Sequence, residues 1–341
     1  MRKWQLKCQF TDIKATDYIF LFSQQSFYDS FFVFVIGVYH YFSYFCREIN
    51  AQVFIVIQSI TKIMQIRLND KLFDLSTPAI MGIVNATPDS FYPGSRYNND
   101  KNLLTTVERM ITDGVDIIDI GGYSTRPTAE DISSDEEIKR LSGVIETILK
   151  KFPDTIISID TFRANVARQM VQNYHVSIIN DIGGGTLDDM MFETIADLQV
   201  TYVLMHTRGT PQNMQSLTDY DNVVSEVLGF LQKHIAQLRL LGVNDIIVDP
   251  GFGFAKTIEQ NYTLLNKLSY FNELNVPVLA GMSRKSMITK VLDIEAKDAL
   301  SGTTALNMLA LMGGASILRV HDVKEAKQAV TIFNQFNLAK D

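Results

Sequence analysis

Eight short apolar segments recur between residues 79 and 320, separated by stretches that are long enough to form helices. Their continuous Val, Ile and Leu content is typical of strands that are buried on both faces, as in a parallel sheet. Eight strands that alternate with helices predict an α/β fold of the (β/α)₈ or TIM-barrel class. The predicted strands are Ala79–Val84, Asp116–Gly121, Ile156–Ile159, Val176–Ile179, Val200–Leu204, Asp245–Val248, Val276–Ala280 and Ala315–Leu318.

The intervening stretches carry apolar residues at the spacing of one helix face. The clearest predicted helices are Leu103–Asp113, Ser134–Lys151, Val223–Leu241 and Asp298–Met312. Ser134 followed by Glu137 also predicts a capping box, in which each side chain bonds the other residue's backbone.

A β-hairpin is predicted just before the first barrel strand. Gln65–Leu68 and Lys71–Leu75 alternate polar and apolar residues around the turn pair Asn69-Asp70. We expect this hairpin to plug the amino-terminal mouth of the barrel.

Residues 1–63 differ in composition from the rest of the chain, which places a boundary near Met64. They contain both cysteines, Cys8 and Cys46, and more basic than acidic side chains, whereas the whole chain has a net charge of −7. We therefore expect an N-terminal extension over residues 1–63, outside the catalytic fold, and one catalytic barrel over residues 64–341. The apolar run Phe31–Cys46 is shorter than the roughly 20 residues that span a bilayer.

Three interpretations of the extension stay open. It is translated upstream sequence before a start at Met64, which we favour, or a membrane anchor, or an ordered accessory element. Membrane contact is expected only if the extension is present in the natural protein.

Charge and cysteine content exclude several classes of function. A net charge of −7 argues against a nucleic-acid partner, which would need a basic face. Residues 64–341 contain no cysteine, so they hold neither a disulfide framework nor a thiolate metal site. This composition fits a cytoplasmic protein.

Almost every predicted strand ends in a side chain that can take part in chemistry. The ends are Asn85, Ser124-Thr125-Arg126-Pro127, Asp160, Asn180, Met205-His206, Asp249, Ser283-Arg284-Lys285, and Arg319 with His321. The active site of a (β/α)₈ barrel lies where the carboxyl ends of its strands meet, so we expect one shared pocket. Taken singly, Asp160 or Asp249 could instead cap the next helix.

Five of these strand ends, in order, resemble the dihydropteroate synthase family of pterin-binding barrel enzymes. They are Asn85–Phe91, Gly121–Pro127, Asp249–Lys256, Gly281–Lys285 and Arg319–Val323, and the resemblance covers about residues 64–336. It implies the joining of 6-hydroxymethyl-7,8-dihydropterin pyrophosphate to p-aminobenzoate, with release of pyrophosphate. It also implies a homodimer formed through helices of the outer ring.

The resemblance implies a site residue by residue. Asp249 and Asn180 would recognise the amino-pyrimidinone edge of the pterin, since a carboxylate accepts paired N–H donors well. Asp160 would reach another ring nitrogen, Lys285 the ring carbonyl, and the Arg319 guanidinium would stack on the ring above a floor made by Met205. The implied catalytic groups are Asp160, Lys285, Arg319 and His321.

The other substrate groups are assigned in the same way. Arg319 and His321 would hold the departing diphosphate, and Asn85 would give one oxygen to Mg²⁺, the one expected cofactor. The loops with Thr125, Arg126 and Phe254 would close over the arylamine, and Ser286 would meet its carboxylate.

This chain departs from the family pattern at three loop positions. Tyr123 stands where the family often has glutamate, Pro93 where it usually has a second aspartate, and Ala255 where it usually has glycine. These differences affect loop closure and arylamine handling rather than the pterin groups at the strand tips.

Three rival functions stay open. A pterin-dependent methyltransferase on the same barrel would share Asp160, Asn180 and Asp249 but would not need an anion site at Arg319. A Schiff-base aldolase would use Lys285 as nucleophile. A pterin-binding protein without turnover would bind the ring and form no product.

Overall fold

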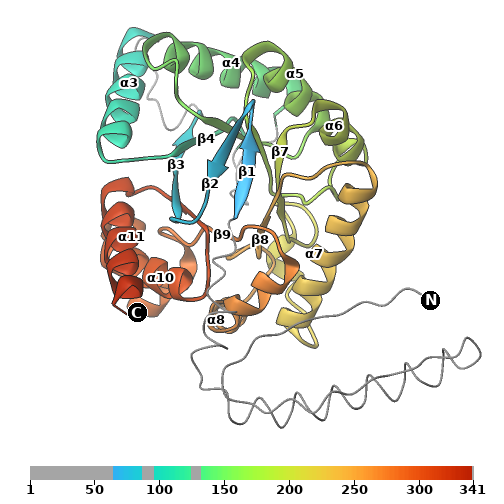
Figure 1. Cartoon of the computed structure of the whole chain (residues 1–341), viewed down its shortest axis with the longest axis vertical. Coiled ribbons are helices and arrows are strands. Elements are labelled where there is room, and N and C mark those ends of the chain that lie inside the picture. The colour runs from blue at the N-terminus through green and yellow to red at the C-terminus, as the bar shows by residue number, and fades with distance from the viewer. Residues whose placement is uncertain (1–63, 87–95, 124–131, 340–341) are drawn as a thin grey trace, which may run out of the picture. The chain divides into compact units, whose positions relative to one another are not determined.

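Eight parallel strands form a closed barrel with helices around it in the computed structural model, which describes residues 64–86, 96–123 and 132–339 (Figure 1). The strand order is β8-β7-β6-β5-β4-β3-β10-β9, and a parallel bridge between Val248 and Val278 joins the two ends. The strands are β3 Ala79–Asn85, β4 Ile117–Gly121, β5 Ile157–Asp160, β6 Ile178–Asp181, β7 Thr201–Met205, β8 Ile246–Asp249, β9 Leu279–Ala280 and β10 Ile317–Val320. The predicted barrel is confirmed.

Helices connect successive strands and cover the outside of the barrel (Figure 1). They are α3 Arg96–Thr112, α4 Ser134–Lys151, α5 Ala164–Tyr174, α6 Met191–Leu198, α7 Val223–Leu240, α8 Ile258–Asn266, α9 Ser286–Leu292, α10 Leu300–Met312 and α11 Val323–Leu338. Short 3₁₀ turns occur at Met214–Ser216, Leu268–Leu274 and Ala296–Asp298. Burying the apolar faces of these helices against the strands forms the larger of two core clusters.

The hairpin of β1 (Gln65–Leu68) and β2 (Lys71–Asp74) closes the end of the barrel where the strands begin, as predicted. Ile66 and Leu68 pack against a layer of inward-facing side chains from the first half of the strands. The hairpin backbone is also bonded to the barrel, because Thr201 Oγ1 donates to the Arg67 carbonyl at 2.6 Å.

The barrel interior changes from apolar to polar within two residues along several strands. Inward-facing side chains recur every second residue along a strand. In these strands, an inward-facing apolar residue near the start is therefore followed, two positions later, by an inward-facing polar residue near the end. The pairs are Ile117 and Asp119, Ile178 and Asn180, Ile247 and Asp249, and Ile317 and Arg319, whereas β7 has the apolar pair Val203 and Met205. The apolar layer therefore supports a polar layer at the carboxyl end.

Two details of the helix predictions were wrong. The N-cap of α4 is Ser133, whose Oγ accepts from the Glu136 N–H at 3.2 Å, so Ser134 and Glu137 form no capping box. Glu137 is instead fully buried and bonds Arg163 at 2.7 Å, a tertiary contact that outweighs the local pattern. The last predicted helix begins slightly later than Asp298, because a 3₁₀ turn ends at that residue and α10 runs from Leu300 to the predicted end, Met312.

Residues 1–63 lie outside the described residues, so the prediction of a separate extension stays a prediction. Within the described ranges, none of the helices combines the length and the apolar character needed to cross a membrane.

Candidate active site

A network of charged side chains lies inside the barrel at the carboxyl ends of β4, β5, β6 and β10. Arg319 donates from Nε to Asp119 Oδ2 at 2.7 Å and from one terminal nitrogen to Asp160 Oδ2 at 2.6 Å. Asn180 Nδ2 donates to the same Asp119 oxygen at 3.1 Å. Asp119 thus links Asn180 to Arg319, and Arg319 in turn bonds Asp160. Asp160, Asn180 and Arg319 belong to the predicted site, and Asp119 does not.

Strand register explains why these side chains meet. Gly121 of β4 lies opposite Asp160 of β5, and Asp160 lies opposite Asn180 of β6. Gly121 has no side chain of its own, and a Cβ there would be 3.8 Å from Asp160 Oδ2. The guanidinium of Arg319 is held by two carboxylates, which fixes both its position and the direction of its plane.

Asp119 is the site residue that sequence reasoning missed. It is fully buried, and its Oδ1 has no hydrogen-bond partner among the described residues. A buried acceptor without a partner is costly, so a ligand donor is its natural complement. The available signal was a charged residue inside the apolar strand Ile117–Gly121, two positions after an inward-facing isoleucine.

Asp249 and Lys285 form the opposite side of the same cluster. Asp249 is 5% exposed, and its Oδ1 accepts from the Gly251 N–H at 2.7 Å. Lys285 Nζ donates to the Phe252 carbonyl at 2.6 Å and lies 4.8 Å from the centre of the Phe254 ring. Neither Asp249 nor Asp160 caps a helix, since α8 begins after Thr257 and α5 after Arg163, so the capping interpretation is wrong.

The shared burial of these charges shifts their proton affinities. Burial raises the pKa of Asp160 to about 7, although the Arg319 charge acts in the opposite direction. Burial also raises the pKa of Asp249, while the charge of Lys285 and the Gly251 N–H lower it. For Lys285, burial lowers the pKa to about 8 against the attraction of Asp249. Such opposed shifts are typical of functional sites.

His321 is fixed by the loop that follows β9. Ser283 Oγ accepts from the His321 backbone N–H at 3.2 Å and lies 3.0 Å from His321 Nδ1. The Ser283 hydroxyl can donate to Nδ1 while its oxygen accepts the backbone proton, and in that arrangement the ring proton is on Nε2. Desolvation first, and then the charges of Arg319 and Arg284, lower the pKa of His321 to about 4.

The other predicted residues that the structure describes lie around this cluster. Met205 is buried beside Asp249, its register partner on the neighbouring strand. Phe254 is partly buried, whereas Ser286 is exposed at the start of α9. Asn85 is exposed at the end of β3. Thr125, Arg126 and Pro93 lie outside the described residues.

Two of the three departures from the family pattern can be placed. Tyr123 is buried, its ring lies edge-on to Phe162 at 5.2 Å, and its hydroxyl accepts from Gln212 Nε2 at 3.0 Å. This contact ties the end of β4 to the loop after β7. Ala255 has φ of +48°, the left-handed conformation that glycine adopts at least cost.

The part of the chain that the structure describes contains no group of three His, Cys, Asp or Glu side chains arranged to hold a metal ion. Asn85 fits a different kind of site. Mg²⁺ usually keeps several waters and takes one or two protein oxygens together with substrate phosphates. An exposed amide at a strand end suits that pattern.

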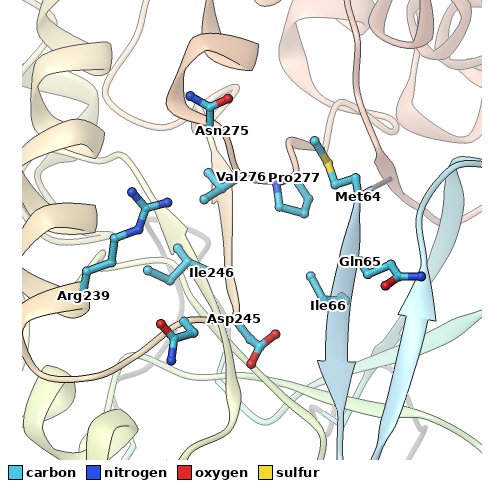
Figure 2. A pocket seen from close by; sticks show the side chains of 10 residues that line it. Met64, Gln65, Ile66, Arg239, Asp245, Ile246, Asn275, Val276 and Pro277 are labelled. Atoms are coloured by element: carbon cyan, nitrogen blue, oxygen red, sulfur yellow. The ribbon is translucent and has the colours of Figure 1, made fainter. Parts of the chain in front are cut away.

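A small pocket of about 150 Å³ lies at the other end of the barrel, beside the hairpin (Figure 2). Its lining comes from β1 and from the segments that lead into β8 and β9, and includes Met64, Ile66, Arg239, Asp245 and Pro277. It is separated from the polar cluster by the apolar layer of the barrel interior.

Comparison with known proteins assigns the class of this barrel. The family model described as "Pterin binding enzyme" matches residues 81–321. That range begins within β3 and ends at His321, so it contains most of β3, the other seven barrel strands and the polar cluster. The chain belongs to the pterin-binding enzymes.

Its relatives within that class are dihydropteroate synthases. The enzyme of Haemophilus influenzae is 41% identical over 272 residues, which are 79% of this chain and 98% of the relative. A Yersinia pestis dihydropteroate synthase solved with a sulfonamide drug has 38% identity and a TM-score of 0.74, covering 81% of this chain and 100% of its own. The Xanthomonas albilineans enzyme with 4-aminobenzoic acid has 35% identity and a TM-score of 0.74, covering 81% and 98%.

Proposed function

We propose that this chain joins 6-hydroxymethyl-7,8-dihydropterin pyrophosphate to p-aminobenzoate and releases pyrophosphate and 7,8-dihydropteroate, a step of folate synthesis. The observation that carries the proposal is the convergence of Asp119, Asp160, Asn180, Asp249, Lys285 and Arg319 at one end of the barrel. A flat heterocycle with N–H donors on one edge and a carbonyl beside them is complementary to such a set.

The pterin would lie between the two sides of the cluster. Asp249 and Asn180 recognise the amino-pyrimidinone edge, and Asp160 reaches another ring nitrogen. The free Oδ1 of Asp119 is a further acceptor for a ring donor. Lys285 donates to the ring carbonyl, Met205 forms an apolar floor, and the fixed plane of Arg319 stacks on the ring.

The diphosphate leaves before the arylamine attacks. The bond between the methylene carbon and the diphosphate oxygen breaks, and both electrons go to the diphosphate. The electron-rich pterin spreads the positive charge left on the methylene. Arg319 stabilises the departing charge as a cation, and neutral His321 does so as an Nε2–H donor.

The arylamine nitrogen then forms the new bond to the methylene and loses its proton to solvent. Phe254 lies beside Lys285 and would cover the arylamine ring, while the exposed Ser286 at the start of α9 would meet its carboxylate. Thr125 and Arg126 are assigned to the same region by resemblance alone. The 4-aminobenzoic acid bound to the Xanthomonas albilineans relative supports an arylamine subsite in this fold.

Mg²⁺ is proposed as the cofactor, with Asn85 as its protein ligand. It would neutralise charge on the diphosphate oxygens when bound. The support is the exposed amide of Asn85 at the same end of the barrel as the cluster.

A homodimer and a cytoplasmic location complete the proposal. The outer helices α10 and α11 carry exposed apolar side chains, among them Leu309, Met312 and Ile332, which a second copy would cover. The lack of cysteine in residues 64–341 agrees with a reducing compartment. Sedimentation analysis and cell fractionation test these two statements.

The deciding experiment measures pyrophosphate release from the purified chain with pterin pyrophosphate, p-aminobenzoate and Mg²⁺. We expect release that requires the arylamine, together with formation of dihydropteroate. A pterin-dependent methyltransferase or a binding protein without turnover would release none. Borohydride trapping of a covalent adduct on Lys285 with a carbonyl substrate would instead support the aldolase.

A further inference from the structure

Lys256 is a buried lysine on the turn that follows β8. It is 4% exposed, although its side chain carries a charge that is normally kept in water. Burial lowers the pKa of Lys256 to about 7, while the nearby charge of Asp249 acts in the opposite direction. Burying a charged amine costs free energy, which hydrogen bonds to nearby acceptors must offset.

Four acceptors surround the Lys256 amine, and three of them are the nearest. Its Nζ lies 2.9 Å from the Gly251 carbonyl, 2.9 Å from the Phe254 carbonyl and 3.1 Å from His206 Nδ1. The His206 carbonyl is the fourth, at 3.4 Å. Burial lowers the pKa of His206 to about 2, so its ring is neutral and Nδ1 can accept. The three protons of the ammonium therefore match three acceptors, two on the turn and one at the end of β7.

The turn between Asp249 and Lys256 has a conformation that needs this support. Gly251, Gly253 and Ala255 have φ of +73°, +82° and +48°, and a Cβ on Gly251 would be 2.0 Å from the His206 carbonyl oxygen. This folded path turns carbonyl groups toward the protein interior. The Gly251 carbonyl also accepts the Phe254 N–H at 3.1 Å, so without the amine it is the Phe254 carbonyl that would lose its donor among the described residues.

The same turn supplies the groups that hold Lys285. The Phe252 carbonyl accepts from Lys285 Nζ at 2.6 Å, and the Phe254 ring lies 4.8 Å from that nitrogen. Asp249, at the start of the turn, accepts the Gly251 N–H. Movement of the turn would therefore displace one whole side of the pterin cluster and leave Asp160, Asn180 and Arg319 in place.

We propose that Lys256 is a positioning residue: by fixing the turn from Asp249 to Lys256 against the end of β7, it aims Lys285 and Phe254 at the ligand. The role in ligand binding rests on the proposed function, whereas the effect on the turn does not. Lys256 touches neither the pterin nor the arylamine in this scheme.

The test compares Lys256→Met, Lys256→Gln and Leu231→Ala with the wild-type chain. Lys256→Met keeps the length and removes all donors, and Lys256→Gln restores two N–H groups. Leu231→Ala lowers stability by truncating a fully buried side chain of α7, outside the turn from Asp249 to Lys256. Two quantities are measured in each: the Kd for pterin pyrophosphate by calorimetry, and amide hydrogen exchange over residues 251–255.

Lys256→Met should raise the Kd about tenfold or more and speed amide exchange in the turn, as loss of buried donors predicts. Lys256→Gln should fall between Met and wild type, and Leu231→Ala should leave both quantities unchanged. Equal changes in Lys256→Met and Leu231→Ala, or none in either, would overturn the proposal. If Lys256→Met does not fold, Lys256→Gln decides alone by the same comparison.

Pterin pyrophosphate binding by the wild-type chain distinguishes failure of the proposed function from failure of the Lys256 proposal. If wild-type protein binds no pterin pyrophosphate, the function is wrong, and amide exchange in the Lys256 variants still decides whether the amine holds the turn.

Discussion

Arg319 Nε lies 2.7 Å from Asp119 Oδ2, an ion pair between the last and the second strand of the barrel. Asp119 is fully buried and Arg319 is 18% exposed at its side chain. This pair joins strands that are separated by β3 in the sheet, so it spans the barrel interior rather than lying along its wall. Asp160 then adds a second carboxylate to the same guanidinium.

Replacing Asp119 should affect both stability and binding. Asp119→Ala leaves Arg319 with one carboxylate and Asn180 without its acceptor, and breaking a buried pair typically costs about 3–5 kcal/mol. Urea unfolding and pterin calorimetry would measure the two effects. The exposed Asp189→Ala is the matched control. A loss of less than about 1 kcal/mol would show that the pair does not hold the site together.

Pterin affinity should fall as the pH rises through 8. The pKa of Lys285 is lowered to about 8, so above this pH it loses the charge that strengthens its bond to the ring carbonyl. Lys285 binds its proton less tightly in the folded than in the unfolded state, so its contribution to stability rises between pH 8 and about 10.4. Deprotonation of Lys285 does not destabilise the fold in this range, so unfolding caused by Lys285 cannot explain the loss of pterin affinity.

The matched variant is Lys285→Arg, which stays charged throughout this range. Calorimetry from pH 7 to 9.5 should show a falling affinity for the wild-type chain and a flat one for Lys285→Arg. Parallel curves for the two proteins would assign the titration to another group.

The His321 ring should be neutral at pH 7, with its proton on Nε2. Its pKa is lowered to about 4, and Ser283 donates to Nδ1 in the arrangement described above. Nitrogen-detected NMR of the ligand-free chain should show the Nε2–H tautomer between pH 6 and 8. In Ser283→Ala the preference between tautomers should weaken. A midpoint near 6.5 in the wild-type protein would contradict this account of His321.

Replacing Arg163 alone should lower the free energy of unfolding more than replacing Glu137 and Arg163 together. Burial raises the pKa of Glu137, and a hydrogen bond from Thr161 and then the charges of Arg163 and Arg140 act in the opposite direction. Arg163→Ala leaves a fully buried carboxylate without that cation, for a predicted loss of about 3–5 kcal/mol. Adding Glu137→Gln should recover part of that loss in denaturant unfolding, whereas additive losses would rule out a coupled pair.

Strand order and the polar strand ends could be predicted because both repeat along the sequence. The apolar runs fix the strands, and parallel strands in a barrel bring their carboxyl ends together. The exact polar layer was harder to predict, because it depends on which residues face inward. Asp119 and Arg319 lie within their strands, two positions after Ile117 and Ile317, rather than in the loops that follow.

Other features depend on contacts between distant segments and leave little local signal. Ser134 and Glu137 have the spacing of a capping box, yet Glu137 is taken by Arg163 from the next loop. Lys256 follows a glycine-rich turn and resembles a solvated loop lysine in sequence, but the turn folds its carbonyls around the amine. His206 could be assigned only once its Nδ1 was seen to accept from Lys256.

The most direct measurement of the central claim is the Kd of pterin pyrophosphate for the wild-type chain and for Asp249→Ala. The buried Asp249 carboxylate should accept the paired donors of the pterin edge, and charge-assisted bonds of this kind contribute about 1.5–3 kcal/mol each. The account predicts tight binding by the wild-type chain and a loss of about a hundredfold or more in the variant. Equal affinity in the two proteins would contradict the pterin site described here.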